Sequence, residues 1–176
     1  MPTNLEIKLK LDSFEEKLQL LKKIGAKQTQ ILNQKDIYYA VPKALLKLRT
    51  ENKKSTLIFY NREEKKKRRW SEFYLLNIDD KNPSSFLKKL FAVEAVVQKK
   101  RKLFLFNNTR IHLDNVKGLG KFLELETLVI NGKPDAEKRF KEIIYFLKLD
   151  QSKQIRKSYR DLIIEKKLND FKQIQN

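Results

Sequence analysis

Cysteine is absent from this chain of 176 residues, and histidine and tryptophan each occur only once. The lack of cysteine excludes disulfides and cysteine-based zinc sites, and it is typical of a cytoplasmic protein. Long apolar runs are also missing, since none approaches the roughly 20 residues that cross a bilayer. Met1 is followed by polar residues rather than by the apolar core of a signal peptide. We therefore expect a cytoplasmic protein that does not enter a membrane.

The composition indicates one folded domain with an anionic partner. Hydrophobic residues make up 40% of the chain and charged residues 35%, with both signs mixed along it. Because no repeat, linker or low-complexity segment divides the sequence, we expect a single domain over residues 1–166, a frayed polar tail over 167–176, and a monomer or homodimer. The net charge of +18 favours a nucleic acid, a nucleotide or polyphosphate, or a membrane surface as the partner.

Alternation of polar and apolar residues predicts that most of the chain forms β-strands. The predicted strands cover residues 4–11, 27–41, 45–51, 55–62, 70–78 and 96–106, and a hairpin follows over residues 110–126. Between the strands, Ser13 and Glu16 predict a capping box for a helix that ends at Gly25. A second short helix is predicted to begin at Asn82, with Pro83 at its first position.

The C-terminal part changes to helical spacing. After Pro134, apolar stripes predict two further helices, and the second stripe includes Ile155 and Tyr159. The whole pattern predicts an α+β fold, mainly β, in which about eight strands form a closed antiparallel tunnel barrel with peripheral and C-terminal helices.

The hairpin over residues 110–126 gathers charge on one surface. Arg110, His112 and Asp114 share one face of its first strand, and Glu124 and Glu126 share one face of its second. For a single hairpin, a solvated outer face explains this pattern more simply than a site does. Other predicted strands also carry charged residues at alternating positions, however, which favours one charged surface shared by several strands.

The other charged faces carry Glu6, Lys8 and Lys10, then Lys47 and Arg49, then Lys99 and Arg101. If the apolar faces of the barrel pack against outer helices, the charged faces point inward. Burying these charges costs much free energy unless ions and a ligand occupy the interior. Carboxylates bind Mg²⁺ or Mn²⁺, and arginine and lysine hold phosphate oxygens. A triphosphate bound with a divalent cation satisfies both sets.

Short motifs follow one another in a fixed order along nearly the whole chain. They are Asn4-Leu-Glu-Ile-Lys8, Asp36-Ile-Tyr38, Leu46-Lys-Leu-Arg49, Tyr60-Asn-Arg62, Lys99-Lys-Arg101, Arg110-Ile-His-Leu-Asp114, Gly118-Leu-Gly120, Glu124-Leu-Glu126 and Ser158-Tyr159. Each motif alone is unspecific, but the ordered set resembles the CYTH superfamily, the triphosphate tunnel metalloenzymes. This superfamily includes class IV adenylyl cyclases, thiamine triphosphatases and inorganic triphosphatases.

The resemblance implies an eight-stranded tunnel that binds ATP, thiamine triphosphate or inorganic triphosphate with Mg²⁺ or Mn²⁺. By position it implies a set of metal ligands, namely Glu6, Asp114, Glu124 and Glu126. It also implies a set of phosphate-binding residues, namely Lys8, Lys47, Arg49, Arg62, Lys99, Arg101 and Arg110. Attack by the ribose 3′-hydroxyl would give cyclic AMP and pyrophosphate, and attack by water would release phosphate. The opening motif and the helical C-terminal end resemble the cyclases more, so we expect a cyclase-like enzyme, with a triphosphatase as the alternative.

Three positions depart from the resemblance. Asn4 stands in place of the first acidic residue and is predicted to weaken one metal position. Leu45 stands where an arginine is expected, and Phe73 where a tyrosine is expected. These changes bear on activity and on substrate preference more than on the fold, and they leave open a tunnel that binds triphosphate without turnover.

Other features have two interpretations each. Lys8 and His112 are the predicted catalytic residues, although His112 could instead hold Asp114 in place. The basic run at residues 65–69 is either a solvated loop or a guide for anions, and Trp70 and Tyr159 serve either packing or base stacking. The basic strands also suit a module that binds single-stranded nucleic acid, but carboxylates on the same faces would repel its phosphates.

Overall fold

The structure is a computed structural model that describes residues 3–63 and 70–174, with the side chains of residues 61–71 left out of the description. Three features considered in the sequence therefore lie outside the described residues. They are the basic run at residues 65–69 and the side chains of Arg62 and Trp70.

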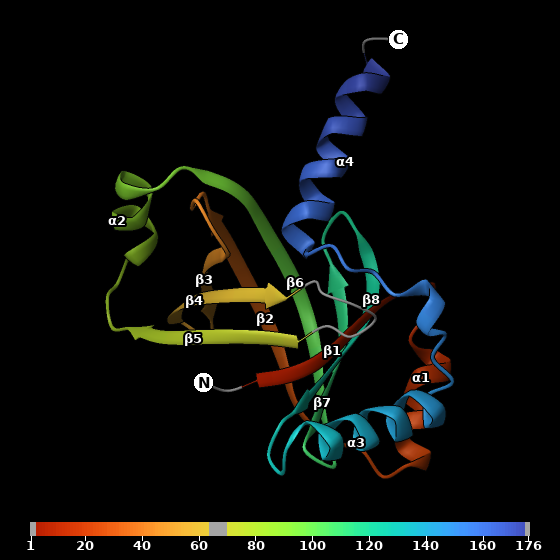
Figure 1. The fold of residues 1–176 in the computed structure, drawn as a ribbon. Helices are drawn as coiled ribbons and strands as arrows, with labels where there is room; N and C mark the ends of the chain where they lie inside the picture. Colours follow the sequence, from red (N-terminus) through yellow and green to blue (C-terminus); the bar gives the residue numbers. More distant parts are fainter. Residues whose placement is uncertain (1–2, 64–69, 175–176) are drawn as a thin grey trace.

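The strands form one closed antiparallel barrel (Figure 1). In chain order they are β1 (Thr3–Leu11), β2 (Lys27–Tyr39), β3 (Leu45–Glu51), β4 (Lys54–Glu63), β5 (Trp70–Ile78), β6 (Val93–Phe106), β7 (Thr109–Val116) and β8 (Gly120–Leu128). Around the barrel the order is β1-β5-β4-β3-β2-β6-β7-β8. The first strand closes the barrel, because it pairs with β5 on one side and with β8 on the other. The predicted eight-stranded barrel is confirmed for the described part of the chain.

The observed strands agree closely with the predicted ranges. β3 and β5 have the predicted bounds, and β6 begins at Val93 rather than at residue 96. The β7–β8 hairpin turns through Gly118 and Gly120, whose φ angles of 79° and 99° lie in the region that glycine adopts without strain. The hairpin prediction is therefore confirmed together with its turn residues.

The first helix, α1 (Glu15–Lys23), begins differently from the prediction. Its N-cap is Phe14, and no side chain caps it. Ser13 lies one residue earlier and accepts a hydrogen bond from the backbone N–H of Glu15, so the capping box with Glu16 is wrong. The C-terminal end is as predicted. Gly25 has a φ of 72°, and the N–H of Ala26 reaches back to the carbonyl of Leu21, as in a Schellman motif.

Three further α-helices follow. α2 (Pro83–Leu90) is capped by Asn82, whose side chain accepts from the N–H of Ser85, as the sequence predicts. α3 (Lys133–Phe146) and α4 (Tyr159–Ile174) are joined by a segment with a short 3₁₀ turn (Gln151–Lys153). Ile155 lies before α4 and donates its N–H to the carbonyl of Lys8, so its assignment to the last helix is wrong.

The last helix extends further than expected. Lys166, after which a frayed tail was expected, lies within α4, which continues to Ile174 and projects from one end of the barrel (Figure 1). Leu168, Phe171 and Ile174 on its outer half are exposed. In the described part of the chain, no helix is both long and apolar enough to span a membrane.

The helices cover one side of the barrel and leave another side open (Figure 1). α1 and α3 pack on β1, β7 and β8 around a core that includes Leu21, Leu125 and Ile143, all fully buried. Leu87 of α2 covers part of β2 and β3. On the outer face of β4 and β5, by contrast, Phe59 and Tyr74 form an exposed cross-strand pair. The expectation that helices cover the outside is confirmed for the first side and wrong for this one.

Candidate active site

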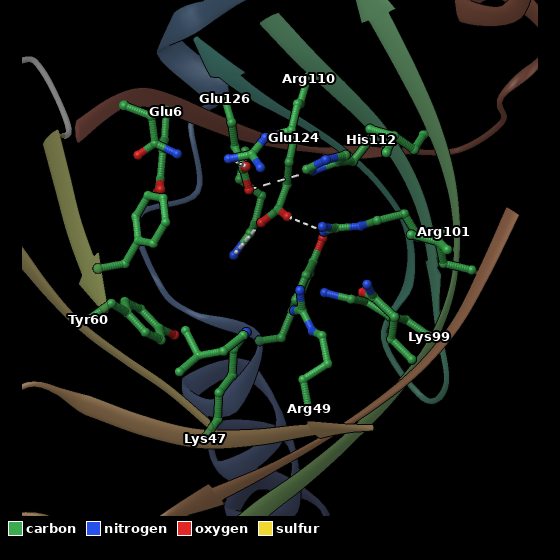
Figure 2. A pocket seen from close by; sticks show the side chains of 18 of the residues that line it. Glu6, Lys47, Arg49, Tyr60, Lys99, Arg101, Arg110, His112, Glu124 and Glu126 are labelled. Carbon is green, nitrogen blue, oxygen red and sulfur yellow. Dashed lines mark hydrogen bonds and ion pairs between the residues drawn. The ribbon is translucent and has the colours of Figure 1, made fainter. Parts of the chain in front are cut away.

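A cavity of about 360 Å³ runs into the barrel, and charged side chains line it (Figure 2). The lining cations are Lys8, Lys47, Arg49, Lys99, Arg101 and Arg110, and the lining carboxylates are Glu6, Glu51, Glu124 and Glu126. They come from β1, β3, β6, β7 and β8, at alternating positions on each strand. Residues far apart in the sequence therefore meet in one tunnel, as the alternation predicts.

The charges of the tunnel nearly cancel one another. Behind its lining lie two more carboxylates, Asp36 and Asp114, each fully buried. With these included, the described tunnel holds equal numbers of cations and carboxylates. The net charge of +18 therefore comes from the rest of the chain, and attraction of a triphosphate would depend on how charges are separated inside the tunnel.

One side of the tunnel is a cationic wall, which we define as Lys47, Arg49 and Lys99 around Asp36. Asp36 Oδ1 accepts from Arg49 Nε at 2.8 Å, and its Oδ2 accepts from Arg49 and from Lys47 at 2.8 and 2.9 Å. Lys99 Nζ lies 3.8 Å from the same Oδ2. These contacts hold three cations from two strands in place without a ligand.

The electrostatics of the cationic wall depend on Asp36. Burial disfavours its charge, but Arg49 and Lys47 outweigh burial and hold the pKa of Asp36 well below its usual range. Burial, together with Arg49 and Lys99, lowers the pKa of Lys47 to about 7, against the opposing effect of Asp36. Lys47 therefore loses its charge near neutral pH in the free protein, while Arg49 stays charged.

The second buried aspartate, Asp114, holds Arg101. The Asp114 carboxylate accepts from Arg101 Nε and Nη2, each at 2.6 Å, and from the Tyr159 hydroxyl at 3.0 Å. Lys99 Nζ lies 3.8 Å away and so stands between the two aspartates. Burial opposes the charge of Asp114, but Arg101 and Lys99 lower its pKa.

The opposite side of the tunnel is an acidic wall, which we define as His112, Glu124 and Glu126 (Figure 2). One ligand atom of each lies within 4.8 Å of those of the other two, a spacing that fits a single metal ion. Glu124 also contacts Lys8 at 3.2 Å and Arg101 at 2.7 Å. Despite burial, these cations hold the pKa of Glu124 well below its usual range.

His112 is buried in the acidic wall. Burial, with the nearby charge of Arg101, lowers the pKa of His112 to about 4, against the effect of Glu126. Its Nδ1 lies 3.6 Å from Glu126 Oε1 and has no hydrogen-bond partner in the described structure. The described hydrogen bonds of Asp114 go to Arg101 and Tyr159 instead. The geometry thus gives no support to the idea that His112 positions Asp114.

The structure brings together most of the residues predicted for the site. Glu6 lines the tunnel, and Arg110 pairs with Glu126 at 3.0 Å. Asp114, predicted as a metal ligand, pairs with Arg101 and lies outside the three-residue group of the acidic wall. Lys10, which shares a face with Lys8 in the sequence, is exposed beyond the tunnel. Asn4 lines the cavity, and its buried Oδ1 has no hydrogen-bond partner in the described structure.

Lys8 lies at the end of the tunnel that Tyr159 closes. Its Nζ donates to the carbonyl of Lys157 at 3.0 Å and lies 4.0 Å from the centre of the Tyr159 ring. Lys99 contacts the same ring at 4.9 Å, and Phe122 packs against it edge-on at 5.1 Å. Tyr159 is therefore a buried packing residue, which is one of the two roles considered from the sequence, and it also contacts two cations of the site.

Sequence reasoning missed two members of the site. Asp36 appeared only as part of a motif, and Tyr159 only as part of a motif and as a residue for packing or base stacking. A signal for Asp36 was present, since an aspartate between Lys35 and Ile37 in a β-rich segment places one carboxylate on the inward face of an otherwise unremarkable strand. No local signal could show that Tyr159 reaches Asp114, because the two residues lie 45 positions apart.

Comparison with known proteins finds relatives that match this chain over most of its length. The CYTH domain profile matches residues 2–159. A Methanocaldococcus jannaschii protein, named "Putative adenylate cyclase MJ0240", is 28% identical over 169 residues, which are 90% of this chain and 97% of that protein. The solved structure of the PH1012 protein from Pyrococcus horikoshii has a TM-score of 0.79 at 28% identity, covering 90% of this chain and 98% of that one.

A more distant structure shares the fold alone. It is that of a Hippeastrum protein named "Putative adenylyl cyclase HpAC1" and described as having a dominant triphosphatase activity. It has a TM-score of 0.63 at 18% identity and covers 93% of this chain and 95% of that one.

Proposed function

This chain belongs to the CYTH family, whose members are mostly adenylyl cyclases or triphosphatases, and on that premise we propose that it is a metal-dependent enzyme that converts ATP to cyclic AMP and pyrophosphate. The observation that carries the proposal is the separation of charge across one cavity. The cationic wall faces the acidic wall, so that a triphosphate and a metal ion would each find a complementary surface (Figure 2). The name of the Methanocaldococcus jannaschii relative supports the choice of a cyclase.

The phosphates would bind the cationic wall. Arg49 is held by Asp36 through its Nε and one Nη, so a phosphate would meet its remaining donors. Lys47 and Lys99 would add charge on either side. Because Asp36 already fixes these side chains, little ordering is left for the ligand to impose, which favours both affinity and alignment.

The acidic wall fits a divalent cation. Glu124 and Glu126 supply carboxylate oxygens that lie close enough together to bind one ion. Glu6 lies opposite Glu126 on the neighbouring strand and would add a third ligand. When bound, the ion would neutralise phosphate charge and orient the attacking oxygen.

The chemical step would need little covalent help from the chain. The ribose 3′-hydroxyl would attack the α-phosphorus, the bond from that phosphorus to the bridging oxygen would break, and pyrophosphate would leave. Lys8 and Arg101, which meet at Glu124, would stabilise charge at the reacting phosphate. The adenosine would contact the apolar part of the lining, which includes Leu32, Ile58, Phe73, Leu75 and Leu103.

The test is a turnover assay with Mg²⁺ and, separately, with Mn²⁺. ATP, thiamine triphosphate and inorganic triphosphate are presented in parallel, and cyclic AMP, pyrophosphate and phosphate are measured separately. Cyclic AMP with an equal amount of pyrophosphate is the expected result. Release of phosphate without cyclic AMP would overturn the cyclase and identify a triphosphatase.

Binding assays separate the remaining possibilities. A rise in melting temperature with triphosphate and metal, but no product, would indicate a tunnel that binds without turnover. Nucleic acid that binds tightly without metal and dissociates steeply with salt, while nucleotides fail to bind, would overturn the proposal in favour of a nucleic-acid module.

A further inference from the structure

Two nitrogen atoms of the tunnel lining, Arg110 Nε and His112 Nδ1, are buried without a hydrogen-bond partner in the described structure. The His112 side chain is 3% exposed, and its Nδ1 has no hydrogen bond in the described structure. Buried polar atoms are nearly always hydrogen-bonded, and leaving one unpaired costs free energy. The nearest acidic oxygen, Glu126 Oε1, is 3.6 Å away, which is too long for a hydrogen bond.

This spacing suits two ligands of one ion. Metal–nitrogen and metal–oxygen bonds of about 2.1 Å at a tetrahedral angle place their donors about 3.4 Å apart. The His112 and Glu126 atoms are close to that separation, and an oxygen of Glu124 completes a group whose ligand atoms all lie within 4.8 Å. Arg110 occupies the other oxygen of Glu126, so Oε1 remains on the side of His112.

The strand register brings these three residues together and keeps Asp114 apart. Across the β7–β8 hairpin, His112 lies directly opposite Glu124, and Glu126 lies two residues further along the same face. Asp114 lies opposite Phe122 of β8 on one side of its strand and opposite Arg101 of β6 on the other. Its carboxylate is therefore taken up by the guanidinium of Arg101.

We propose that His112 is a nitrogen ligand of the divalent cation in the tunnel, together with Glu124 and Glu126, and that the site consequently prefers Co²⁺ to Mg²⁺. This inference rests on the proposed function for the presence of a metal, but it names a ligand and a preference that the function does not require. An imidazole ligand favours ions later in the first transition row, whereas Mg²⁺ selects oxygen ligands. Asp114 holds the guanidinium of Arg101 through two hydrogen bonds.

The experiment uses the full chain with metal alone, so that no result depends on turnover. Calorimetric titration with CoCl₂ and MgCl₂ compares the wild type with His112→Asn, which offers a neutral oxygen in place of nitrogen. The expected result is that the ratio of Co²⁺ to Mg²⁺ affinity falls about tenfold or more in the variant. Thr109→Val, on the same strand but paired with Thr127 away from the wall, is the matched control and should keep the wild-type ratio.

A second measurement needs no variant at the histidine. Pulsed electron paramagnetic resonance of the Mn²⁺-loaded wild type should show coupling to an imidazole nitrogen. Loss of bound Mn²⁺ in Glu126→Gln would locate that signal in the tunnel. Bound Mn²⁺ without nitrogen coupling, or an unchanged affinity ratio in folded His112→Asn, would overturn the inference even if the enzyme turns over ATP. Nitrogen coupling without turnover of any triphosphate would support the inference and count against the proposed function.

Discussion

The two walls of the tunnel are made by the same alternating strands, but their charges are held in different ways. In the cationic wall, a fully buried carboxylate satisfies three cations through bonds of 2.8 to 2.9 Å and one longer contact. In the acidic wall, Glu124 and Glu126 are also paired with cations, yet the Nδ1 of His112 has no partner in the described structure. The cationic wall is thus complete by itself, while the acidic wall retains a donor atom for a ligand. Substitutions that act on one wall at a time test this difference.

The largest effect is expected from removing charge from the acidic wall. In Glu124→Gln/Glu126→Gln the tunnel keeps its shape but loses two anionic metal ligands, and turnover should fall about a hundredfold or more. Steady-state assays with saturating Mn²⁺ measure this loss. Glu72→Gln, at an exposed position of β5, is the control and should retain full activity. Comparable turnover in the double variant and the control would mean that the acidic wall has no part in the reaction.

A substitution in the cationic wall should lower the stability of the folded protein as well as its activity. Asp36→Asn leaves Lys47, Arg49 and Lys99 without their shared anion, and the free energy of unfolding should fall by about 3 kcal/mol. Because the pKa of Asp36 is lowered on folding, its contribution is present above about pH 4 and is lost as the pH falls further. Urea unfolding at pH 7 and at lower pH measures both effects. A variant as stable as the wild type at pH 7 would show that Asp36 does not hold this wall.

The protonation of Lys47 makes the cationic wall sensitive to pH. Its pKa of about 7 means that the charged form, which binds phosphate, is depleted as the pH rises. Triphosphate affinity should therefore fall by up to about tenfold for each pH unit above 7. Lys47→Arg stays charged and should remove this dependence, as fluorescence or calorimetric titration between pH 6 and 9 would reveal. A slope shared by both proteins would assign the titration to another group.

The same shift has a consequence for stability. Between the folded pKa of about 7 and the ordinary value of 10.5, the unfolded chain binds a proton at Lys47 that the folded chain does not. Stability from this group therefore increases as the pH rises from 7 toward 10.5. Lys47→Met should lack that increase in urea titrations across this range.

The smallest effect is expected where the two walls meet, at the end closed by α4. Tyr159→Phe removes one hydrogen bond to Asp114 but keeps the ring that Lys8 and Lys99 contact. The cost should be about 1 kcal/mol of unfolding free energy. Tyr159→Ala would lose the ring as well and should be more destabilising by a clear margin. Equal losses in the two variants would show that the ring contributes nothing.

Much of the fold could be predicted because its signals are local. Alternation along strands such as β3 and β5 fixes which side chains face the tunnel, and Gly25, Pro83 and Gly120 mark where elements end or begin. The start of α1 was predicted wrongly, since Ser13 and Glu16 fit a capping box that the backbone does not form. Short-range patterns of this kind offer several competing solutions, and packing of the helix on the barrel decides among them.

The sequence by itself determined that the chain forms a tunnel of inward-facing charges, because a period of two is a property of every extended strand. Only the tertiary structure decided which charges meet. The register between β6 and β7 pairs Arg101 with Asp114, and the register between β7 and β8 places His112 beside Glu124. These pairings join residues that lie 13 and 12 positions apart in the sequence. Their choice depends on the packing of all strands at once, which no local stretch of sequence encodes.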